Sequence, residues 1–213
     1  EIYAARSDGS ELTRLTDDKA YNAEATVSPD GKRIIFTSTR DGDIDLYSMN
    51  IDGSDVRRVT SRIGYDGGAF YSPNGKQIVW RASYPATASD TADYRGLLAQ
   101  RLVRPAALEI WVANADGSEP RQVTRIGGAN VAPFFTHDGK RIIFTSNHLD
   151  PKGRNFDLFL VNVDGTGLEQ VTFDADFDGF PMFSPDGKKL VWASNRNAKT
   201  RGGTHLFTAH WVQ

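Results

Sequence analysis

A six-residue phrase occurs four times along this chain and constrains its fold more than any other feature. It reads apolar residue, Ser or Thr, Pro or His, Asp or Asn, Gly, Lys, and its copies are 27–32, 71–76, 135–140 and 183–188. A second phrase alternates with it: Asp-Gly and a Ser or Thr, followed five residues later by Val-Thr or Leu-Thr. Two turn signals that alternate in this way indicate a repeat architecture.

The spacing of the first phrase identifies the class of repeat. Its turn residues Asp30, Asn74, Asp138 and Asp186 are separated by 44, 64 and 48 residues. A period in the forties with several short strands is typical of β-propeller blades. The apolar run after each copy suits a strand that is buried on both faces. We therefore expect an all-β fold, a β-propeller of four-stranded blades, with one short helix inserted in a blade loop.

Counting strands sets an expectation for the domain organisation. We assign residues 1–213 to a single β-propeller region with units 1–16 (partial), 17–60, 61–124, 125–172 and 173–213 (partial). These units supply 17 strands, whereas a ring of four-stranded blades needs a multiple of four. The sequence therefore predicts the C-terminal part of a longer propeller, six-bladed when complete, although a five-bladed ring fits the same arithmetic.

Composition excludes several classes of function. The 25 basic residues nearly balance the 27 acidic ones, which gives no pull toward nucleic acid or an anionic membrane. No apolar run is long enough for a transmembrane segment. The chain contains no cysteine, so disulfides and thiolate metal sites are excluded.

Three phrases closely resemble the repeat of the TolB-like propeller family, which is also described as a WD-like β-propeller repeat. They are Ser28-Pro29-Asp30-Gly31-Lys32, Asp45-Leu46-Tyr47-Ser48-Met49-Asn50 and Asp52-Gly53-Ser54. The resemblance covers essentially the whole chain, but its motifs are turns and core residues. It implies an exported, periplasmic protein of the bacterial cell envelope that binds protein or peptide partners.

Function should be found where the repeats differ, on the face opposite the tight turns, because variable loops carry most binding residues. Four polar residues begin the first strands of the units on that face: Asn22, Asp66, Asn130 and Asp178. One interpretation is a ring at a channel mouth that holds a ligand, a cation or a peptide terminus. The alternative is a structural cap, as Asn and Asp form in turns. Glu24 has no counterpart in the other units, so it is a further candidate, unless it merely pairs with Arg40.

Basic residues near the ends of the second strands reach the same face. They are Arg40, Arg81, His148 and Arg196. Arginine forks match carboxylates, so this surface could bind a carboxylate-bearing ligand or an acidic peptide. The alternative is a set of solvated loop charges with internal ion pairs.

The long spacing contains an insertion, residues 84–104, on this face. Helical spacing of its apolar residues predicts a helix over 89–103, capped by Ser89 or Thr91. Such a helix could cover the channel mouth, present its apolar side to a partner, or pack on its own propeller. We favour the last, since large exposed apolar patches are uncommon.

Metal and catalytic signals are weak. Residues 174–179 spell the start of a calcium loop, but Pro185 stands at its twelfth position, which excludes an EF-hand. A looser calcium site at Asp174, Asp176 and Asp178 stays open, and no other cofactor is expected.

The sequence also lacks a Gly-x-Ser-x-Gly hydrolase elbow, and of its histidines we place only His148 on the predicted functional face. We therefore expect a non-catalytic binding scaffold. The alternative is a carbohydrate-active or hydrolytic propeller enzyme with its site at the channel mouth. A small-molecule or glycan ligand stays open in either case.

Overall fold

The computed structural model describes residues 1–104, 107–153, 155–200 and 202–212. The strands, grouped by sheet, are β1 (Tyr3–Ala4) and β2 (Thr13–Arg14); β3 (Asn22–Val27), β4 (Arg33–Ser38), β5 (Asp45–Asn50) and β6 (Arg57–Arg58); β7 (Tyr65–Tyr71), β8 (Gln77–Ser83), β9 (Glu109–Asn114) and β10 (Arg121–Gln122); β11 (Asn130–Phe135), β12 (Arg141–Ser146), β13 (Asp157–Asn162) and β14 (Glu169–Gln170); β15 (Asp178–Phe183), β16 (Lys189–Ser194) and β17 (His205–His210). Helix α1 spans Ala88–Ala99.

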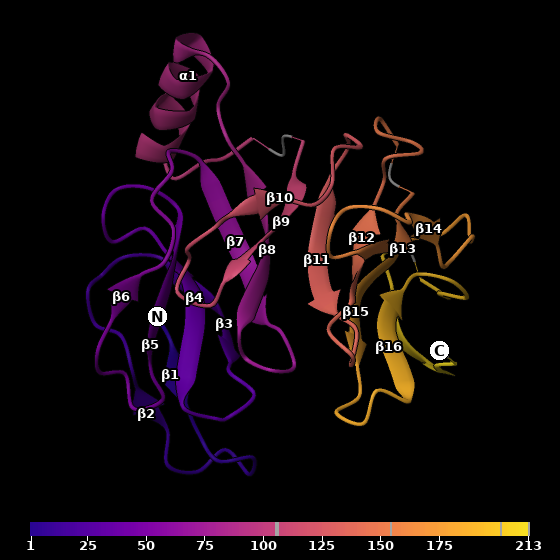
Figure 1. Ribbon diagram of the computed structural model, residues 1–213, viewed down its shortest axis with the longest axis horizontal. Coiled ribbons are helices and arrows are strands. Elements are labelled where there is room, and N and C mark those ends of the chain that lie inside the picture. The colour runs from indigo at the N-terminus through magenta and orange to yellow at the C-terminus, as the bar shows by residue number, and fades with distance from the viewer. Residues whose placement is uncertain (105–106, 154, 201, 213) are drawn as a thin grey trace.

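Each sheet is an antiparallel meander in chain order, and the sheets follow one another as the blades of a propeller (Figure 1). The predicted fold class is confirmed: an all-β propeller with blades of antiparallel strands and a short helix in a blade loop. In the part of the chain that the structure describes, β15, β16 and β17 make no contact with the strands of the first blade. These residues therefore form a partial propeller of four blades.

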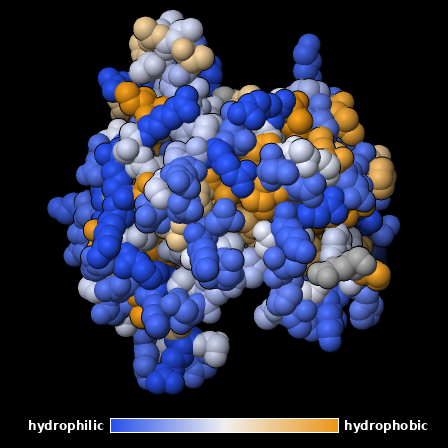
Figure 2. Space-filling model, in the orientation of Figure 1, coloured by the Kyte–Doolittle hydropathy of each residue, from blue (hydrophilic) through white to orange (hydrophobic). Residues whose placement is uncertain are grey.

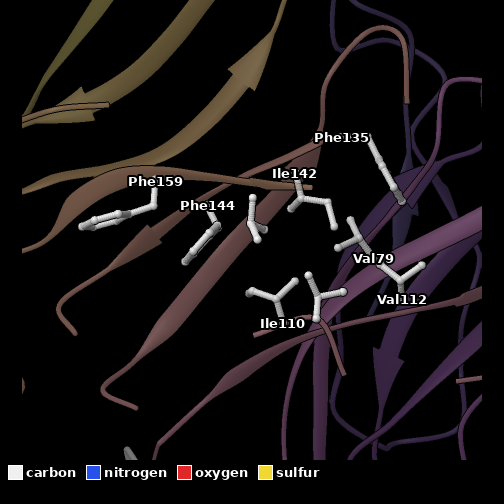
Figure 3. Packing of buried hydrophobic residues seen from close by; sticks show 9 residues of the cluster. Val79, Ile110, Val112, Phe135, Ile142, Phe144 and Phe159 are labelled. Carbon is white, nitrogen blue, oxygen red and sulfur yellow. The ribbon is translucent and has the colours of Figure 1, made fainter. Parts of the chain in front are cut away.

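The core lies between the blades. Val79, Ile110 and Val112 of one blade pack against Phe135 and Phe144 of the next (Figure 3). The second strands β4 and β12 are buried along nearly their whole length, as the continuous apolar runs predicted, and so are the third strands β5 and β13. A blade exposes two apolar faces when alone, so stacking against its neighbours is what stabilises it.

The Ser-Pro-Asp-Gly turn adopts the geometry expected from its residues. Gly31 has a φ of +71°, and its N–H donates to the carbonyl of Ser28 at 2.9 Å. The carboxylate of Asp30 accepts from the Ser28 hydroxyl at 2.7 Å and from the backbone N–H of Lys32 at 3.1 Å. The same clamp recurs in the other three copies, with Asn74, Asp138 and Asp186 as the acceptors.

The Asp-Gly-Ser turn has a role that its sequence did not reveal. A Cβ added at Gly117 would lie 2.1 Å from the carbonyl oxygen of Val59, which follows the outer strand of the preceding blade. Gly53 and Gly165 approach Leu15 and Val123 in the same way, at 2.9 and 2.7 Å. This turn therefore rests directly on the neighbouring blade, and only glycine leaves enough room for the contact.

Helix α1 differs from its prediction at both ends. It is capped by Thr87, whose side chain accepts from the N–H of Asp90 while Asp90 accepts from the N–H of Thr87. This reciprocal capping box satisfies two free donors, so the helix starts before Ser89. Bonds from Gln100 to Leu97 and Leu98 tighten the last turn, and Arg101 is left-handed at φ +60°. The helix therefore ends before residue 103.

The helix is a projection from the propeller (Figure 1), and no residue of α1 is buried. Figure 2 shows hydrophobic surface where this projection joins the rest of the molecule. Within the described ranges, no helix has the length and apolar character needed to cross a membrane.

Candidate functional site

The face that carries α1 is where the first strand of each blade begins, opposite the β3–β4 turn (Figure 1). We call it the mouth face. The four polar residues predicted there open β3, β7, β11 and β15 and are buried, with at most 4% of each residue exposed. Their side chains therefore lie within the blades and not on an open surface.

Each of these buried residues is hydrogen-bonded to a side chain at or just beyond the end of the neighbouring second strand. Arg40 donates to Asn22 Oδ1 at 3.2 Å, and the Tyr84 hydroxyl donates to Asp66 Oδ1 at 2.5 Å. Arg196 donates to Asp178 Oδ2. In the third blade, Ser146 donates to Asn130 and also contacts His148 Nδ1. The recurring sets are Asn22–Arg40, Asp66–Tyr84, Asn130–Ser146–His148 and Asp178–Arg196.

These sets are repeated structural units. Each set is internally hydrogen-bonded, although Asp66 Oδ2 has no partner among the residues that the structure describes. A ligand would therefore have to compete with an existing hydrogen bond at each set. Burial also lowers the pKa of His148, and its ring packs on Phe159 at 4.5 Å. A binding role for these residues stays a prediction.

Arg81 does not belong with Arg40, His148 and Arg196, as the sequence had suggested. Tyr84 takes that position in the second blade, where its ring packs edge-on against Trp111 at 5.1 Å. Arg81 lies three residues earlier, inside β8, where the other blades have Thr37, Thr145 and Ala193. Arg81 is thus a departure from the repeat.

Glu24 pairs with Arg81 of the next blade and not with Arg40, which instead pairs with Asp18 at 2.9 Å. Arg81 Nη2 also donates to the Tyr65 hydroxyl at 2.6 Å. The side chains of Glu24 and Arg81 are 31% and 16% exposed, so solvent reaches this ion pair. We call these three residues the Glu24–Arg81–Tyr65 cluster.

Backbone geometry makes room for the cluster. The first strand of every blade has a bulge with one left-handed residue, and these residues are Glu24, Gly68, Ala132 and Phe180, with φ of 56°, 64°, 49° and 57°. A Cβ on Gly68 would lie 1.9 Å from Arg81 Nη1. One on Gly67 would lie 2.8 Å from the Tyr65 hydroxyl and 2.9 Å from Glu24 Oε2. The two glycines therefore leave the space that the three side chains fill.

Phe180 is a site residue that sequence reasoning missed. It is 61% exposed although its bulge position is left-handed, a conformation that is unusual for a bulky residue. Its ring contacts Phe177 at 6.0 Å, and Phe177 contacts Phe156 at 5.8 Å. The available signal was the alignment of Phe180 with Glu24, Gly68 and Ala132.

A cavity of about 580 Å³ lies between α1 and the second blade. Its lining includes Arg81 and Tyr65 of the cluster, so the cavity adjoins the mouth face. The other lining residues are Ser83, Tyr84, Pro85, Ala86, Asp90, Asp93, Tyr94, Leu97, Val103, Arg104 and Leu108. The volume lies within the range of small-molecule sites, roughly 300–1,000 Å³.

One side chain ties α1 to the blades. The Tyr94 hydroxyl lies 2.5 Å from Asp43 Oδ1 and 2.7 Å from the carbonyl oxygen of Gly64. Burial and the hydrogen bond to Asp43 raise the pKa of Tyr94, so it remains a neutral donor at physiological pH.

Tyr94→Phe is expected to loosen α1 without unfolding the blades, because each lost hydrogen bond contributes about 1 kcal/mol. Limited trypsin digestion should cleave after Arg95 or Arg101 roughly fivefold faster, since local opening becomes more frequent. The midpoint of thermal unfolding should change little. Tyr3→Phe, at an exposed tyrosine of β1, is the control. Equal cleavage rates in the two variants would show that Tyr94 does not anchor the helix.

The calcium candidates do not gather around a common point. Asp178 is engaged by Trp192 and Arg196, and Asp174 accepts from the backbone N–H of Asp176. Among the residues that the structure describes, no group of three or more His, Cys, Asp or Glu side chains is placed to hold a metal ion. The looser calcium site stays an untested prediction.

Comparison with known proteins relates this chain to a family of propellers. Residues 1–95 match the family model described as the TolB beta propeller domain. A Protein TolB homolog from Chlorobium luteolum is 27% identical over 146 residues, which cover 68% of this chain and 28% of that protein. The chain thus spans less than a third of that relative's length.

Solved structures agree on the fold. A structure assigned to TolB from Agrobacterium tumefaciens matches with a TM-score of 0.74 and 22% identity, covering 98% of this chain and 69% of the other. TolB from Acinetobacter baumannii matches with a TM-score of 0.75 and 20% identity, covering 98% and 45%. A puromycin hydrolase also matches, with a TM-score of 0.61, 13% identity and coverage of 96% and 30%. Likeness at such identities concerns fold and not activity.

Proposed function

Because the chain is a TolB-like β-propeller, we propose that it is a non-catalytic scaffold that binds a protein or peptide at its mouth face. We place it in the periplasm of a bacterial cell envelope, by analogy with the TolB proteins that it resembles. The likeness to a hydrolase rests on fold alone, and no observation on the described residues favours an enzymatic role over binding.

The Glu24–Arg81–Tyr65 cluster carries this proposal. The repeated polar residues of the mouth face are buried and hydrogen-bonded within their blades, whereas this cluster departs from the repeat and meets solvent. Glu24 can accept a hydrogen bond, and Arg81 can donate through nitrogens other than Nη2. These are the groups that read the amides and carboxylates of a peptide.

Phe180 adds an apolar anchor to the same face. Aromatic residues, Phe included, are enriched at protein interfaces relative to the rest of the surface. A left-handed Phe costs about 1–3 kcal/mol of folding free energy, and the bulge that imposes this conformation is common to the four blades. A peptide that carries both an apolar side chain and a carboxylate or polar side chain would therefore suit this face.

Gly68→Ala tests the proposal, because the new methyl group would displace Arg81 while the backbone stays intact. Ala132 already adopts this conformation at the equivalent bulge. Peptides selected from a phage-displayed library on the unmodified protein should bind the variant at least about tenfold more weakly, which corresponds to about 1.4 kcal/mol. Fluorescence polarisation of the labelled peptides measures the affinities.

Gly42→Ala is the matched control. Gly42 is also left-handed, at φ +84°, it lies in a loop of the mouth face, and a Cβ there meets nothing within 4 Å. Selected peptides should bind this variant normally. If they bind Gly68→Ala as tightly as Gly42→Ala, the cluster is not the binding site.

A further inference from the structure

The cavity beneath α1 is a structure that the repeat did not require. Most of its lining residues belong to 84–104, the insertion that lengthens one repeat spacing to 64 residues against 44 and 48. Blade stacking and both turns are complete without it in the other blades. A helix held over a cavity mainly by polar contacts, with no buried residue of its own, calls for a role other than stabilising the fold.

Charges around the cavity are paired with one another. Arg104 forms a bidentate pair with Asp93 at 2.8 and 2.9 Å, and Arg81 pairs with Glu24. Asp90 accepts from the backbone N–H of Thr87 in the capping box. An ionic ligand would have to displace the present partner from one of these pairs, so it would gain less than at a site with an unpaired charge. A neutral ligand can form hydrogen bonds with the guanidinium N–H groups and carboxylate lone pairs that these ion pairs leave unused.

The remaining polar groups offer both donors and acceptors. The hydroxyls of Tyr84 and Tyr94 donate to Asp66 and Asp43, so any further hydrogen bond to these oxygens must come from a donor on the ligand. The Tyr65 hydroxyl accepts from Arg81, so its hydrogen is available to a ligand. A ligand that matches them must itself donate and accept at closely spaced positions.

Apolar surface lies between these polar groups. The lining combines three tyrosine rings with Leu97, Val103 and Leu108. Aromatic rings beside paired arginine and aspartate side chains suit a molecule with one apolar C–H face and a rim of hydroxyl groups. Saccharides have this combination, whereas simple ions and aliphatic ligands do not.

We propose that the cavity beneath α1 is a binding site for a neutral saccharide unit. The hydroxyl rim would contact Arg104, Asp93 and the Tyr65 hydroxyl, and the C–H face would lie on a tyrosine ring. The volume of about 580 Å³ accommodates one or two sugar rings by comparison with other small-molecule sites. This site overlaps the peptide site proposed above at Tyr65 and Arg81, whereas Arg104 and Asp93 lie outside the Glu24–Arg81–Tyr65 cluster.

The test is titration of the intact chain with a panel of neutral methyl glycosides and disaccharides, namely methyl glucoside, methyl galactoside, methyl N-acetylglucosaminide, maltose and cellobiose. Isothermal titration calorimetry gives the affinity. Tryptophan fluorescence gives a second readout, because Trp111 lies 5.1 Å from the Tyr84 ring. Saturable binding of at least one saccharide is expected, with a change in fluorescence.

Arg104→Gln should weaken that binding at least about tenfold, because it removes an arginine fork from the cavity rim. Arg57→Gln is the matched control: both arginines are exposed, at 65% and 69%, and both pair with an aspartate. Arg57→Gln should leave the affinity unchanged. Either variant should keep its affinity for peptides selected at the mouth face. A variant that loses saccharide binding and keeps peptide binding distinguishes this proposal from the proposed peptide site.

Three results would overturn the proposal. The first is a lack of saturable binding across the whole panel. The second is equal saccharide affinity in the Arg104→Gln and Arg57→Gln variants. The third is tighter binding of acetate, benzoate or an uncharged tetra-alanine peptide than of any saccharide, which would identify an anion or peptide pocket instead.

Discussion

Gly117→Ala is expected to lower the free energy of unfolding by about 3 kcal/mol. Two costs add: a left-handed residue with a Cβ loses about 1–2 kcal/mol, and the new methyl group overlaps a backbone carbonyl in the preceding blade. The overlap is severe, since the Cβ would lie 2.1 Å from the Val59 oxygen at a φ of +87°. Chemical denaturation followed by circular dichroism measures the change.

Gly9→Ala separates the two costs. Gly9 occupies the same turn, at φ +82°, but a Cβ there meets nothing within 4 Å. We expect a loss of about 1 kcal/mol, from the backbone conformation alone. A loss at Gly117 no larger than at Gly9 would show that the turn does not bear on the neighbouring blade.

Asp66→Asn is expected to stabilise the protein by about 3 kcal/mol near pH 8 and hardly at all near pH 4. Burial raises the pKa of Asp66 to about 7, and its Oδ2 has no hydrogen-bond partner. The carboxyl of the unfolded chain ionises near pH 4. Asp66 therefore destabilises the folded state progressively as the pH rises from about 4 to about 7, and by a constant amount above that range.

Asparagine fits this position because Asn130 already occupies it in the next blade, where its Nδ2 donates to the carbonyl of Leu108 at 2.8 Å. The Oδ1 atom would still accept from Trp80 and Tyr84. Burial likewise raises the pKa of nearby Asp45 to about 6, so some loss of stability between about pH 4 and pH 6 should remain in the variant.

Asp178→Asn is the matched control, with the opposite sign expected. Asp178 occupies the same position in the last blade, but its carboxylate pairs with Arg196. Removing that charge leaves the guanidinium with Asp174, 3.6 Å away, as its remaining anionic partner. We expect a loss of about 2 kcal/mol near pH 7. Unfolding in urea across the pH range compares both variants with the parent. Equal effects of the two substitutions would mean that Asp66 is not held neutral by burial.

The sequence was sufficient to predict the fold because its signals are local. Pro29, Asp30 and Gly31 determine a turn by their own backbone preferences and short-range hydrogen bonds. The repeat of that turn determines the spacing of the blades, and the apolar runs between turns identify strands buried on both faces. None of these inferences requires knowledge of a distant contact.

The candidate site was harder to predict because its contacts cross from one blade to the next. Glu24 and Arg81 are 57 residues apart in sequence, and Glu24 has a basic residue closer at hand in Arg40. The insertion after β8 also concealed which residues of the second blade align with those of the other blades. Arg81 was therefore grouped with Arg40, His148 and Arg196, whose equivalent in the second blade is Tyr84. Tyr65 and Phe180 carried no motif, because their significance depends on a cavity and a bulge that exist only in the folded chain.

The bulges in the first strands have a consequence for how such a mouth face can change. Four blades hold the same left-handed backbone at one level, yet they bear Glu24, Gly68, Ala132 and Phe180. A carboxylate, a hydrogen, a methyl group and an aromatic ring are thus accommodated in one scaffold geometry. Side chains at these four positions can therefore be substituted without changing the backbone. A new binding specificity could be introduced there one side chain at a time while the blades keep their arrangement.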